Sequence, residues 1–244
     1  TPLINYIDSN VSAISQRGNQ AQLVLETPIA PNQNKIITAS TIIGADGWHG
    51  KTRHFVCPTA QQSKTDVIIL RGGMPADQLP KSFSGPATQL WIGDACHLVS
   101  YPIKQSTEIN FIFSVALHKL SRGSAHQLFA SHPMLHVLAD ACINWHAATI
   151  PSFQELSNWR RGAATLIGDA AHPMPPHLAQ GAGQSFMDIA SLAKWLEAGY
   201  QPANALSKMI DERMSDANSV ARKSKFSGQI LRLKGRSANL RDKL

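Results

Sequence analysis

A short apolar segment followed by Gly168 and Asp169 carries the residue types and spacing best suited to chemistry in this 244-residue chain. Residues 163–167 are apolar and are stopped by the Gly-Asp pair, a pattern typical of a buried parallel strand. In open α/β sheets a ligand lies beyond the carboxyl ends of the strands, where Asp169 is the first polar side chain to emerge. The sequence therefore predicts a ligand site at this edge, and a carboxylate there suits a polyhydroxyl chain.

The segment after Asp169 predicts a stiff loop and then a helix. Three prolines within 173–176 fix the backbone and remove N–H donors, so this loop is not helical. From Gly181 to a stop at Gly199, apolar residues recur at the spacing of an amphipathic helix, whose apolar stripe normally faces the core. That stripe is Ala182, Phe186, Ile189, Ala193 and Leu196. Gly181 and Gly183 leave the first turn without side chains, so a planar or anionic group can approach its free N–H groups.

The whole string, GDAAHPMPPHLAQGAGQSF followed by MDIASLAKWL, resembles the second flavin-binding motif of the single-component FAD-dependent aromatic hydroxylases. The salicylate and 3-hydroxybenzoate hydroxylase branch is the most similar. The resemblance implies that Asp169 holds the flavin ribityl chain and that the amides of 180–183 face the pyrimidine end of the isoalloxazine, where a helix N-terminus stabilises negative charge. It implies these cofactor-binding residues: Gly168, Asp169, Pro176, Gln180, Gly181, Ala182 and Gly183.

Two other interpretations of this stretch fit the residues less well. A strand-to-helix connection that binds no ligand fits any single glycine here better than it fits the whole string. His172 and His177 lie five residues apart across prolines and lack the spacing of a helical zinc pair, so we expect no metal site.

The first part of the chain reads as strands. Residues 10–26 alternate around Arg17-Gly18-Asn19 and predict a two-stranded hairpin. A polar loop is expected over 28–35, followed by a strand over 36–43.

The next residues, GADGWHGKTR, resemble the family's other signature, a strand followed by GADG and a later arginine. The resemblance implies that Asp46, Gly47 and Arg53 contribute to the flavin site, with Asp46 near the pyrophosphate and the nicotinamide approach. The family usually has serine where this chain has Gly50. Taken alone, the Asp-Gly pair also fits an ordinary turn at a strand end.

Residues 65–117 read as antiparallel strands. Alternation over 108–115 predicts a half-buried sheet with Ile109, Phe111, Phe113 and Val115 on one face.

Upstream, WIGDACHLVSYP resembles the family's substrate-domain strand. Period-two geometry puts His97 and Tyr101 on the same face, about 13 Å apart. The resemblance implies that His97 accepts or relays the phenol proton and that Tyr101 orients the ring, because an ionised phenol accepts electrophilic oxygen faster. A structural histidine held by backbone groups is the alternative for His97.

The chain lacks the GxGxxG unit with which these enzymes hold the ADP half of FAD. We therefore expect a fragment: a truncated protein, a proteolytic product, a partial gene or one half of a split protein. The predicted fold class is α/β, a partial FAD-binding domain with an inserted antiparallel-sheet substrate domain. The expected parts are a middle FAD-binding part over 1–60, the substrate domain over 61–155, the return part of the FAD-binding domain over 156–220, and a basic tail over 221–244.

Composition supports a protein of the cytoplasm. The chain has no apolar run of 18 residues and no signal-peptide pattern, so neither a transmembrane segment nor secretion is supported. Three cysteines without CxxC spacing, Cys57, Cys96 and Cys142, favour a reducing compartment.

The tail accounts for the net charge of +7, because 221–244 holds eight basic residues and one acidic residue. Such a segment attracts nucleic acid or an acidic membrane surface, but without a nucleic-acid fold signature we favour a solvated terminal helix and expect no nucleic-acid partner.

The rest of the chain is less informative. Short helices are expected over 125–130 and 133–141, and an amphipathic helix over 206–220. Five histidines without ligand spacing are expected to be surface residues: His118, His126, His132, His136 and His146.

These features predict an enzyme that, when complete, uses FAD, NADH or NADPH, and oxygen to hydroxylate a phenolic or aromatic acid. The fragment alone is expected to be inactive, and an N-terminal half in trans or a homo-oligomer is a possible partner. Two alternatives remain open: another flavin reaction on the same fold, such as quinone-precursor hydroxylation or halogenation, and a non-catalytic remnant that binds an aromatic ligand or a partner.

Overall fold

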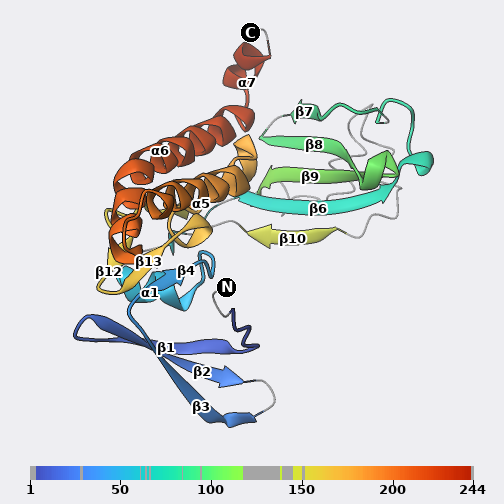
Figure 1. The fold of residues 1–244 in the computed structure, drawn as a ribbon. Coiled ribbons are helices and arrows are strands. Elements are labelled where there is room, and N and C mark those ends of the chain that lie inside the picture. Colours follow the sequence, from blue (N-terminus) through green and yellow to red (C-terminus); the bar gives the residue numbers. More distant parts are fainter. Residues whose placement is uncertain are drawn as a thin grey trace. The chain divides into compact units, whose positions relative to one another are not determined.

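A computed structural model of the chain describes residues 4–27, 30–60, 62–63, 65, 67–83, 85–93, 95–117, 138, 145–149 and 152–242 (Figure 1). The chain divides into two compact units. The first comprises residues 1–62 and 153–225, and the second comprises residues 63–152 and 226–244. No helix among the described residues is long and apolar enough to cross a bilayer.

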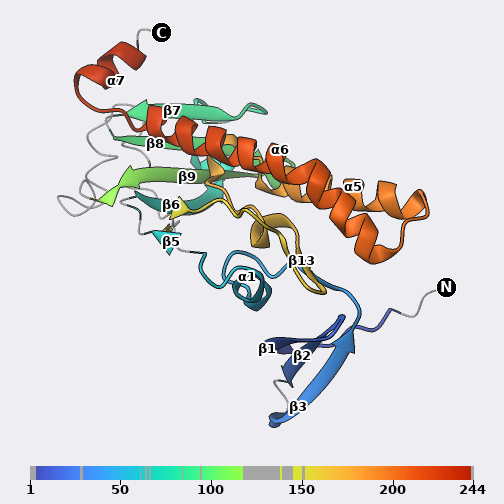
Figure 2. The same ribbon diagram turned by 90° about the vertical axis from the view of Figure 1, so that its left-hand side faces the viewer.

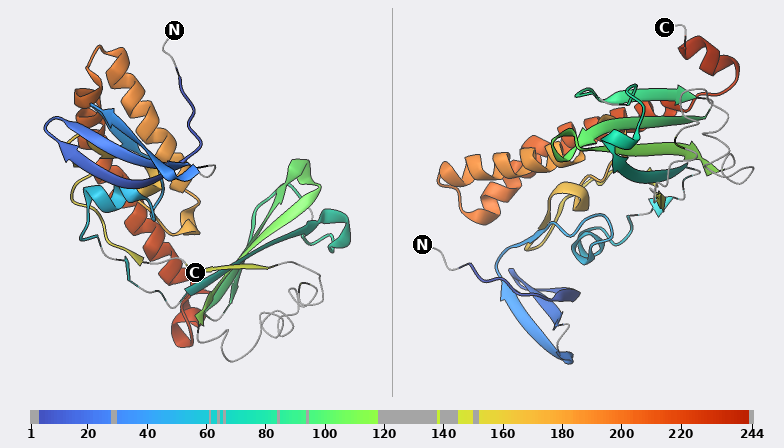
Figure 3. Two further views of the ribbon diagram at one scale, coloured as in Figure 1. Left: turned by 90° about the horizontal axis from the view of Figure 1, so that it is seen from below. Right: turned by 90° about the vertical axis from the view of Figure 1, so that its right-hand side faces the viewer.

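The first unit begins with a three-stranded antiparallel sheet, β1 (Asn10–Arg17), β2 (Gln20–Thr27) and β3 (Ala30–Ala39) (Figure 3). The predicted hairpin is confirmed, and Gly18 takes the positive φ of +56° that its tight turn requires. The predicted loop over 28–35 is wrong from Ala30 onward, because the backbone of β3 pairs with β2 there. Ladder hydrogen bonds join backbone groups, so a polar segment can extend a hairpin whose partner strand is already formed.

The predicted strand over 36–43 is also wrong as a single strand. β3 ends at Ala39, and β4 (Ile42–Gly44) belongs to a different sheet. That sheet has the order β12-β13-β4, with β12 (Arg160–Arg161) antiparallel to β13 (Ala164–Leu166) and β13 parallel to β4. The predicted buried parallel strand is therefore confirmed as β13, although its partner lies more than 100 residues away in the sequence.

Helices pack around this mixed sheet. They are α1 (Lys51–Val56), α5 (Gly181–Glu197) and α6 (Pro202–Leu231) (Figure 2). Leu206 and Met209 of α6 join Ile167 and Leu192 in one buried cluster, and Ala217 packs with the strand residues in another. The predicted helix over 206–220 is thus confirmed within α6.

The helix predicted from Gly181 is confirmed as α5, but its predicted apolar stripe does not face the core. Phe186 is 74% exposed and Ile189 is 48% exposed, and Leu196 is exposed as well. The buried side of α5 instead carries Asp188, Ser191 and Leu192. Apolar spacing alone misplaced the buried face because Asp188 is buried among polar partners that other segments supply.

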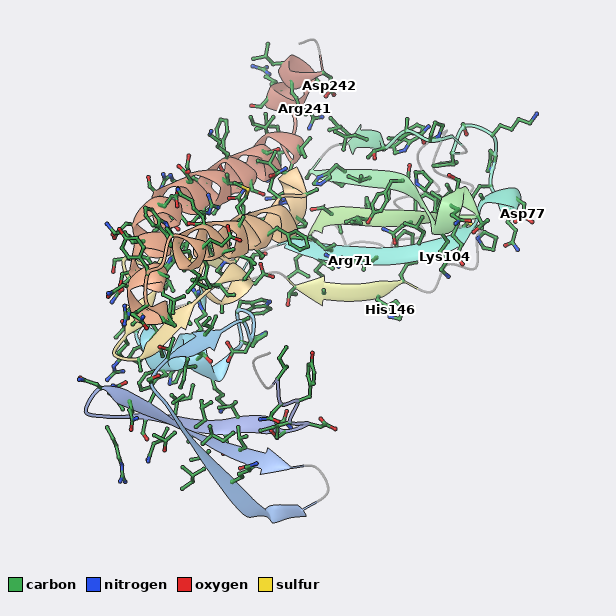
Figure 4. All side chains as sticks on the ribbon, in the orientation of Figure 1. Arg71, Asp77, Lys104, His146, Arg241 and Asp242 are labelled. Atoms are coloured by element: carbon green, nitrogen blue, oxygen red, sulfur yellow. The ribbon has the colours of Figure 1, made fainter. Side chains whose placement is uncertain are left out.

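The second unit contains an antiparallel sheet in the order β10-β6-β9-β8-β7. Its strands are β6 (Val67–Pro75), β7 (Gln89–Gly93), β8 (Cys96–Ile103), β9 (Glu108–Ala116) and β10 (His146–Thr149). The predicted alternation in β9 is confirmed, because Ile109, Phe111, Phe113 and Val115 all lie in the core cluster of this unit. Arg71 on β6 and His146 on β10 are register partners and both are exposed (Figure 4), as expected for His146.

Shorter elements complete the description. β5 (Gln62–Ser63) pairs with β11 (Ser152–Phe153), and single 3₁₀ turns lie at Ala76–Gln78 and Lys104–Ser106. The basic tail continues α6 to Leu231 and then forms α7 (Arg236–Arg241), where Arg241 Nη1 donates to the carbonyl of Leu231. The short helices expected over 125–141 lie outside the described residues except for 138, as do Cys142 and the histidines at 118, 126, 132 and 136.

Candidate functional site

The chain leaves β13 through a 3₁₀ turn, Gly168–Ala170, that is built around a glycine. Gly168 has φ of +58°, and a Cβ there would lie 2.8 Å from Ser185 Oγ on α5, so a side chain would be both strained and crowded. The amides of Ala171 and His172 both donate to the Gly168 carbonyl at 2.9 Å. Residues 168 and 170–173 are buried, whereas Asp169 is exposed. The turn therefore presents one carboxylate outward, as the sequence predicts for Asp169.

The first turn of α5 lies beside this carboxylate. A Cβ on Gly181 would be 3.8 Å from Asp169 Oδ1, so the two are in van der Waals reach, and a Cβ on Gly183 would be 3.7 Å from Gln180 Oε1. No side chain among the described residues caps α5, and Ala182 and Gly183 are exposed. Free N–H groups at a helix start carry roughly half a positive charge. A ligand that carries hydroxyl donors and a polar or anionic acceptor group can thus meet Asp169 and these amides together.

The loop between the turn and α5 is held by a residue that sequence reasoning missed. Ser224 on α6 is completely buried, and its Oγ donates to the carbonyl of Pro175 at 2.6 Å. Pro176 follows at the start of a second 3₁₀ turn, Pro176–Leu178, which ends with Ala179 at φ of +52°. No local pattern in the sequence indicates this contact, because 49 residues separate its two ends.

The GADG segment, residues 44–47, precedes α1 and supplies its cap. Asp46 Oδ2 accepts hydrogen bonds from the amide and the hydroxyl of Thr52, each at 2.9 Å, so Asp46 caps the helix from four residues before Gly50. Gly50 is the N-cap residue and itself supplies no side-chain cap. A Cβ at Gly50 would collide with the Asp46 carboxylate, which explains why a glycine accompanies this arrangement. Gly47 takes φ of +76° in the same turn.

Arg53 joins the two motifs. It is 5% exposed, and its Nη1 donates to the carbonyl of Ala170 at 2.6 Å and to that of Ala171 at 3.3 Å. Burial lowers the pKa of the guanidinium below its ordinary value, while the Cys57 thiol acts in the opposite direction. The predicted cofactor residue Arg53 therefore lies under the Gly168 turn and holds its backbone.

A second buried group holds the same turn from α5. Asp188 Oδ2 accepts the Gly168 amide at 3.0 Å and lies 2.6 Å from His172 Nε2, and Oδ1 accepts from Arg213 Nε at 3.2 Å. Arg213 Nη2 donates in addition to Gln184 Oε1 at 2.6 Å. The sequence analysis did not predict a role for Asp188. Its position three residues before Ser191 and four before Leu192 places it on the same side of the helix as these two residues, and this spacing was the available signal.

The two predicted catalytic residues lie in the second unit, on β8. His97 is 3% exposed and lies opposite Ser114 of β9, while Tyr101 is half-buried and lies opposite Asn110. His97 and Tyr101 are four residues apart on the strand, so both lie on one face, and this face is opposite the apolar cluster to which Leu98 belongs. The structure thus brings the predicted flavin residues together within the first unit, and the predicted catalytic pair onto one strand of the second.

Metal ligation finds no support in the described part of the chain, where no three His, Cys, Asp or Glu side chains are grouped as a metal site.

Residues 8–224 match the family model described as an FAD binding domain. The chain is 28% identical over 222 residues to 3-hydroxybenzoate 6-hydroxylase 1 of Aquipseudomonas alcaligenes, covering 85% of this chain and 55% of that protein. It is 31% identical over 217 residues to 3-amino-4-hydroxybenzoate 2-monooxygenase PtmB3 of Streptomyces platensis, covering 84% and 54%. The chain therefore spans about half the length of these curated relatives.

Solved structures share the fold. The salicylate hydroxylase substrate complex superposes with a TM-score of 0.72 at 19% identity, covering 96% of this chain and 65% of that one. Klebsiella pneumoniae HpxO complexed with FAD and uric acid gives 0.79 at 17% identity, covering 96% and 60%.

Proposed function

Because the chain belongs to the FAD-binding domain family, we propose that it forms the flavin-binding and substrate-binding part of a monooxygenase that hydroxylates a phenolic or aromatic acid. The observation that carries this proposal is the exposed carboxylate of Asp169 beside the uncapped first turn of α5. Bound FAD supplies the redox chemistry that the side chains lack, taking electrons from NADH or NADPH and passing them to oxygen.

The residues of the first unit fit a flavin in two respects. Asp169 would accept hydrogen bonds from the hydroxyls of the ribityl chain, because an ionised carboxylate offers only acceptors. The free amides of 181–183 would hold the pyrimidine end of the ring and stabilise negative charge there, because a helix N-terminus favours anions. Gly181 and Gly183 keep side chains out of the way, since a Cβ at either meets nothing nearer than 3.7 Å and a ring can approach the backbone.

Two residues of the second unit act on the substrate. His97 takes or relays the proton of the phenol, since imidazole exchanges protons near neutral pH, and an ionised phenol accepts oxygen faster. Tyr101, on the same face of β8, orients the aromatic ring. The burial of His97 supports this role, because a site shielded from water strengthens its interaction with a phenolate.

The substrate class follows from the curated relatives, which are named for hydroxybenzoates and aminohydroxybenzoates. We assign a monocyclic aromatic acid bearing a hydroxyl group. The reaction takes place in the cytoplasm, where NADH and NADPH are available and where the thiols of Cys57 and Cys96 stay reduced.

A partner surface lies on α5. Phe186, Met187, Ile189 and Leu196 form an exposed apolar stripe on this helix, and an exposed stripe of this kind marks an interaction site. The occupant is an α/β unit carrying a Gly-rich loop for the ADP half of FAD, which this sequence does not contain. It is joined to this chain covalently or binds in trans.

Visible absorbance tests the proposal. The purified chain is mixed with FAD, with and without a separately expressed Gly-rich βαβ unit of a relative, and passed through gel filtration. Flavin that coelutes with the protein, followed by 3-hydroxybenzoate-dependent NADH or NADPH oxidation and a hydroxylated product, supports the function. A protein that stays colourless in both mixtures contradicts it. Flavin retention without product, with every hydroxybenzoate tried, contradicts the substrate assignment alone.

A further inference from the structure

The turn Gly168–His172 is held at both of its ends by a single carboxylate. Asp188 Oδ2 accepts the Gly168 amide and contacts His172 Nε2, the first and last residues of the turn. Between them, the Asp169 side chain points outward. One oxygen atom of α5 thus contacts both ends of the segment that presents Asp169, while Arg53 holds the carbonyls between them.

The carboxylate is completely buried, so its charge must be balanced. Asp188 and the side chain of His172 have no exposed surface, and Arg213 on α6 is only 5% exposed. Arg213 donates to Oδ1 and supplies the balancing positive charge. A buried carboxylate is tolerated only with such partners, and removing one partner costs more than the pair contributes.

His172 contacts Asp188 through Nε2. Its Nδ1 is buried and meets no hydrogen-bond partner among the described residues, while the ring packs on Trp159. A proton on Nδ1 would leave an unsatisfied buried donor, so the network assigns the proton to Nε2, directed at Asp188.

From this geometry we infer that Asp188 is a positioning residue of the flavin site. It fixes the Gly168–His172 turn in its ligand-binding shape before the cofactor arrives, so that Asp169 and the first turn of α5 are already adjacent. A preorganised site spends none of its binding free energy on ordering the loop. The inference rests on the proposed function only for the identity of the ligand.

Amide hydrogen exchange of the ligand-free chain tests the inference directly. Asp188→Asn removes the charge, and we expect exchange at Gly168, Ala171 and His172 to accelerate by about tenfold or more while β2 amides keep their wild-type rates. Asp216→Asn is the matched control, because Asp216 also lies near Arg213, at 3.7 Å from Nη1, but is 73% exposed and does not touch the turn. General destabilisation would accelerate β2 equally and would overturn the positioning role.

A second variant covers the case in which Asp188→Asn does not fold. His172→Phe keeps an aromatic ring and removes the donor to Asp188, so exchange at Ala171 and at the amide of position 172 should accelerate while Gly168 stays protected. Unchanged exchange at all three amides overturns the inference.

FAD binding then separates this inference from the proposed function. We expect Asp188→Asn to weaken FAD binding by about tenfold, measured by flavin fluorescence, and Asp216→Asn to leave it unchanged. If the wild-type chain binds no FAD while the turn still loosens in Asp188→Asn, the proposed function fails and the structural role stands. Equal FAD affinity in wild type and Asp188→Asn overturns the role in cofactor binding.

Discussion

Arg53 on α1 and Ala170 in the turn after β13 are joined by a hydrogen bond of 2.6 Å from the guanidinium to the backbone carbonyl, across 117 residues of sequence. Together with the contact between Asp188 and Gly168, it holds the turn from two sides. The Arg53 guanidinium donates to the carbonyls of the turn, and the Asp188 carboxylate accepts from the amide of Gly168. The two sequence motifs are therefore parts of one structure.

Replacing Arg53 should destabilise the first unit. Arg53→Met leaves the carbonyls of Ala170 and Ala171 without this donor, and we expect the free energy of unfolding to fall by about 1.5–3 kcal/mol, the range for a hydrogen bond to a charged group. Urea unfolding measures the change. Arg17→Met, at an exposed position of β1, is the control and should stay within about 0.5 kcal/mol of wild type. Equal losses in the two variants would refute the role of Arg53.

Gly168 should tolerate alanine less well than another glycine of positive φ. Gly168→Ala combines an unfavourable backbone, costing about 1–2 kcal/mol, with a Cβ 2.8 Å from Ser185 Oγ. Gly199→Ala, at φ of +86° with nothing within 4 Å of the Cβ, carries only the backbone cost. We expect thermal unfolding to show a larger drop in Tm for Gly168→Ala, and Ser185→Ala in the same chain to recover much of the excess. Identical Tm values for the two glycine variants would contradict the packing argument.

This chain has Gly50 where the family usually has serine, and a Cβ at this position would collide with the Asp46 carboxylate. Gly50→Ala displaces the Asp46 carboxylate from Thr52, and losing a helix cap costs about 0.5–2 kcal/mol. Gly50→Ser displaces it too, but the serine hydroxyl can cap α1 itself, so this variant should lose less stability in urea unfolding. A serine variant as unstable as the alanine variant would show that capping is not the cause.

Glu212 should give the stability of the α5 and α6 pair a distinct pH dependence. Hydrogen bonds from Lys194, and then from Ser191 and Trp195, lower the pKa of Glu212 from 4.5 to about 2, while desolvation acts in the opposite direction. A lowered carboxyl pKa stabilises the fold above the unfolded-state value and loses that effect as pH falls through the folded value. The difference in Tm between wild type and Glu212→Gln should therefore be greatest above about pH 5 and disappear towards pH 2. Glu197→Gln, exposed at the end of α5, is the control; a difference constant over this range would contradict the assignment.

Local chemistry made the turn after β13 predictable. An apolar run, a Gly-Asp stop and the glycines of the next helix each have a short-range cause, and in the structure Gly181 at the start of α5 lies beside Asp169. The strand β3 could not be predicted in this way. Its polar residues are held by pairing with β2, and backbone pairing leaves no mark in side-chain composition.

The prediction of which face of α5 is buried was wrong for a related reason. Apolar periodicity selects the face with Phe186 and Ile189, yet the core side carries Asp188. The partners of Asp188 are His172, 16 residues before it, and Arg213, 25 residues after it. Long-range polar pairing decides such a face, and one sequence does not reveal it.

The central claim is that Asp169 and the start of α5 bind the ribityl and ring portion of a flavin. FMN is the direct probe, because it carries that portion without the ADP half. Titration of the chain into FMN, followed by flavin fluorescence, should give saturable binding that Asp169→Ala weakens by about tenfold. Asp211→Ala, an exposed carboxylate on α6, should bind as wild type does. Equal affinity in wild type and Asp169→Ala, or no saturable signal from either, would contradict the account.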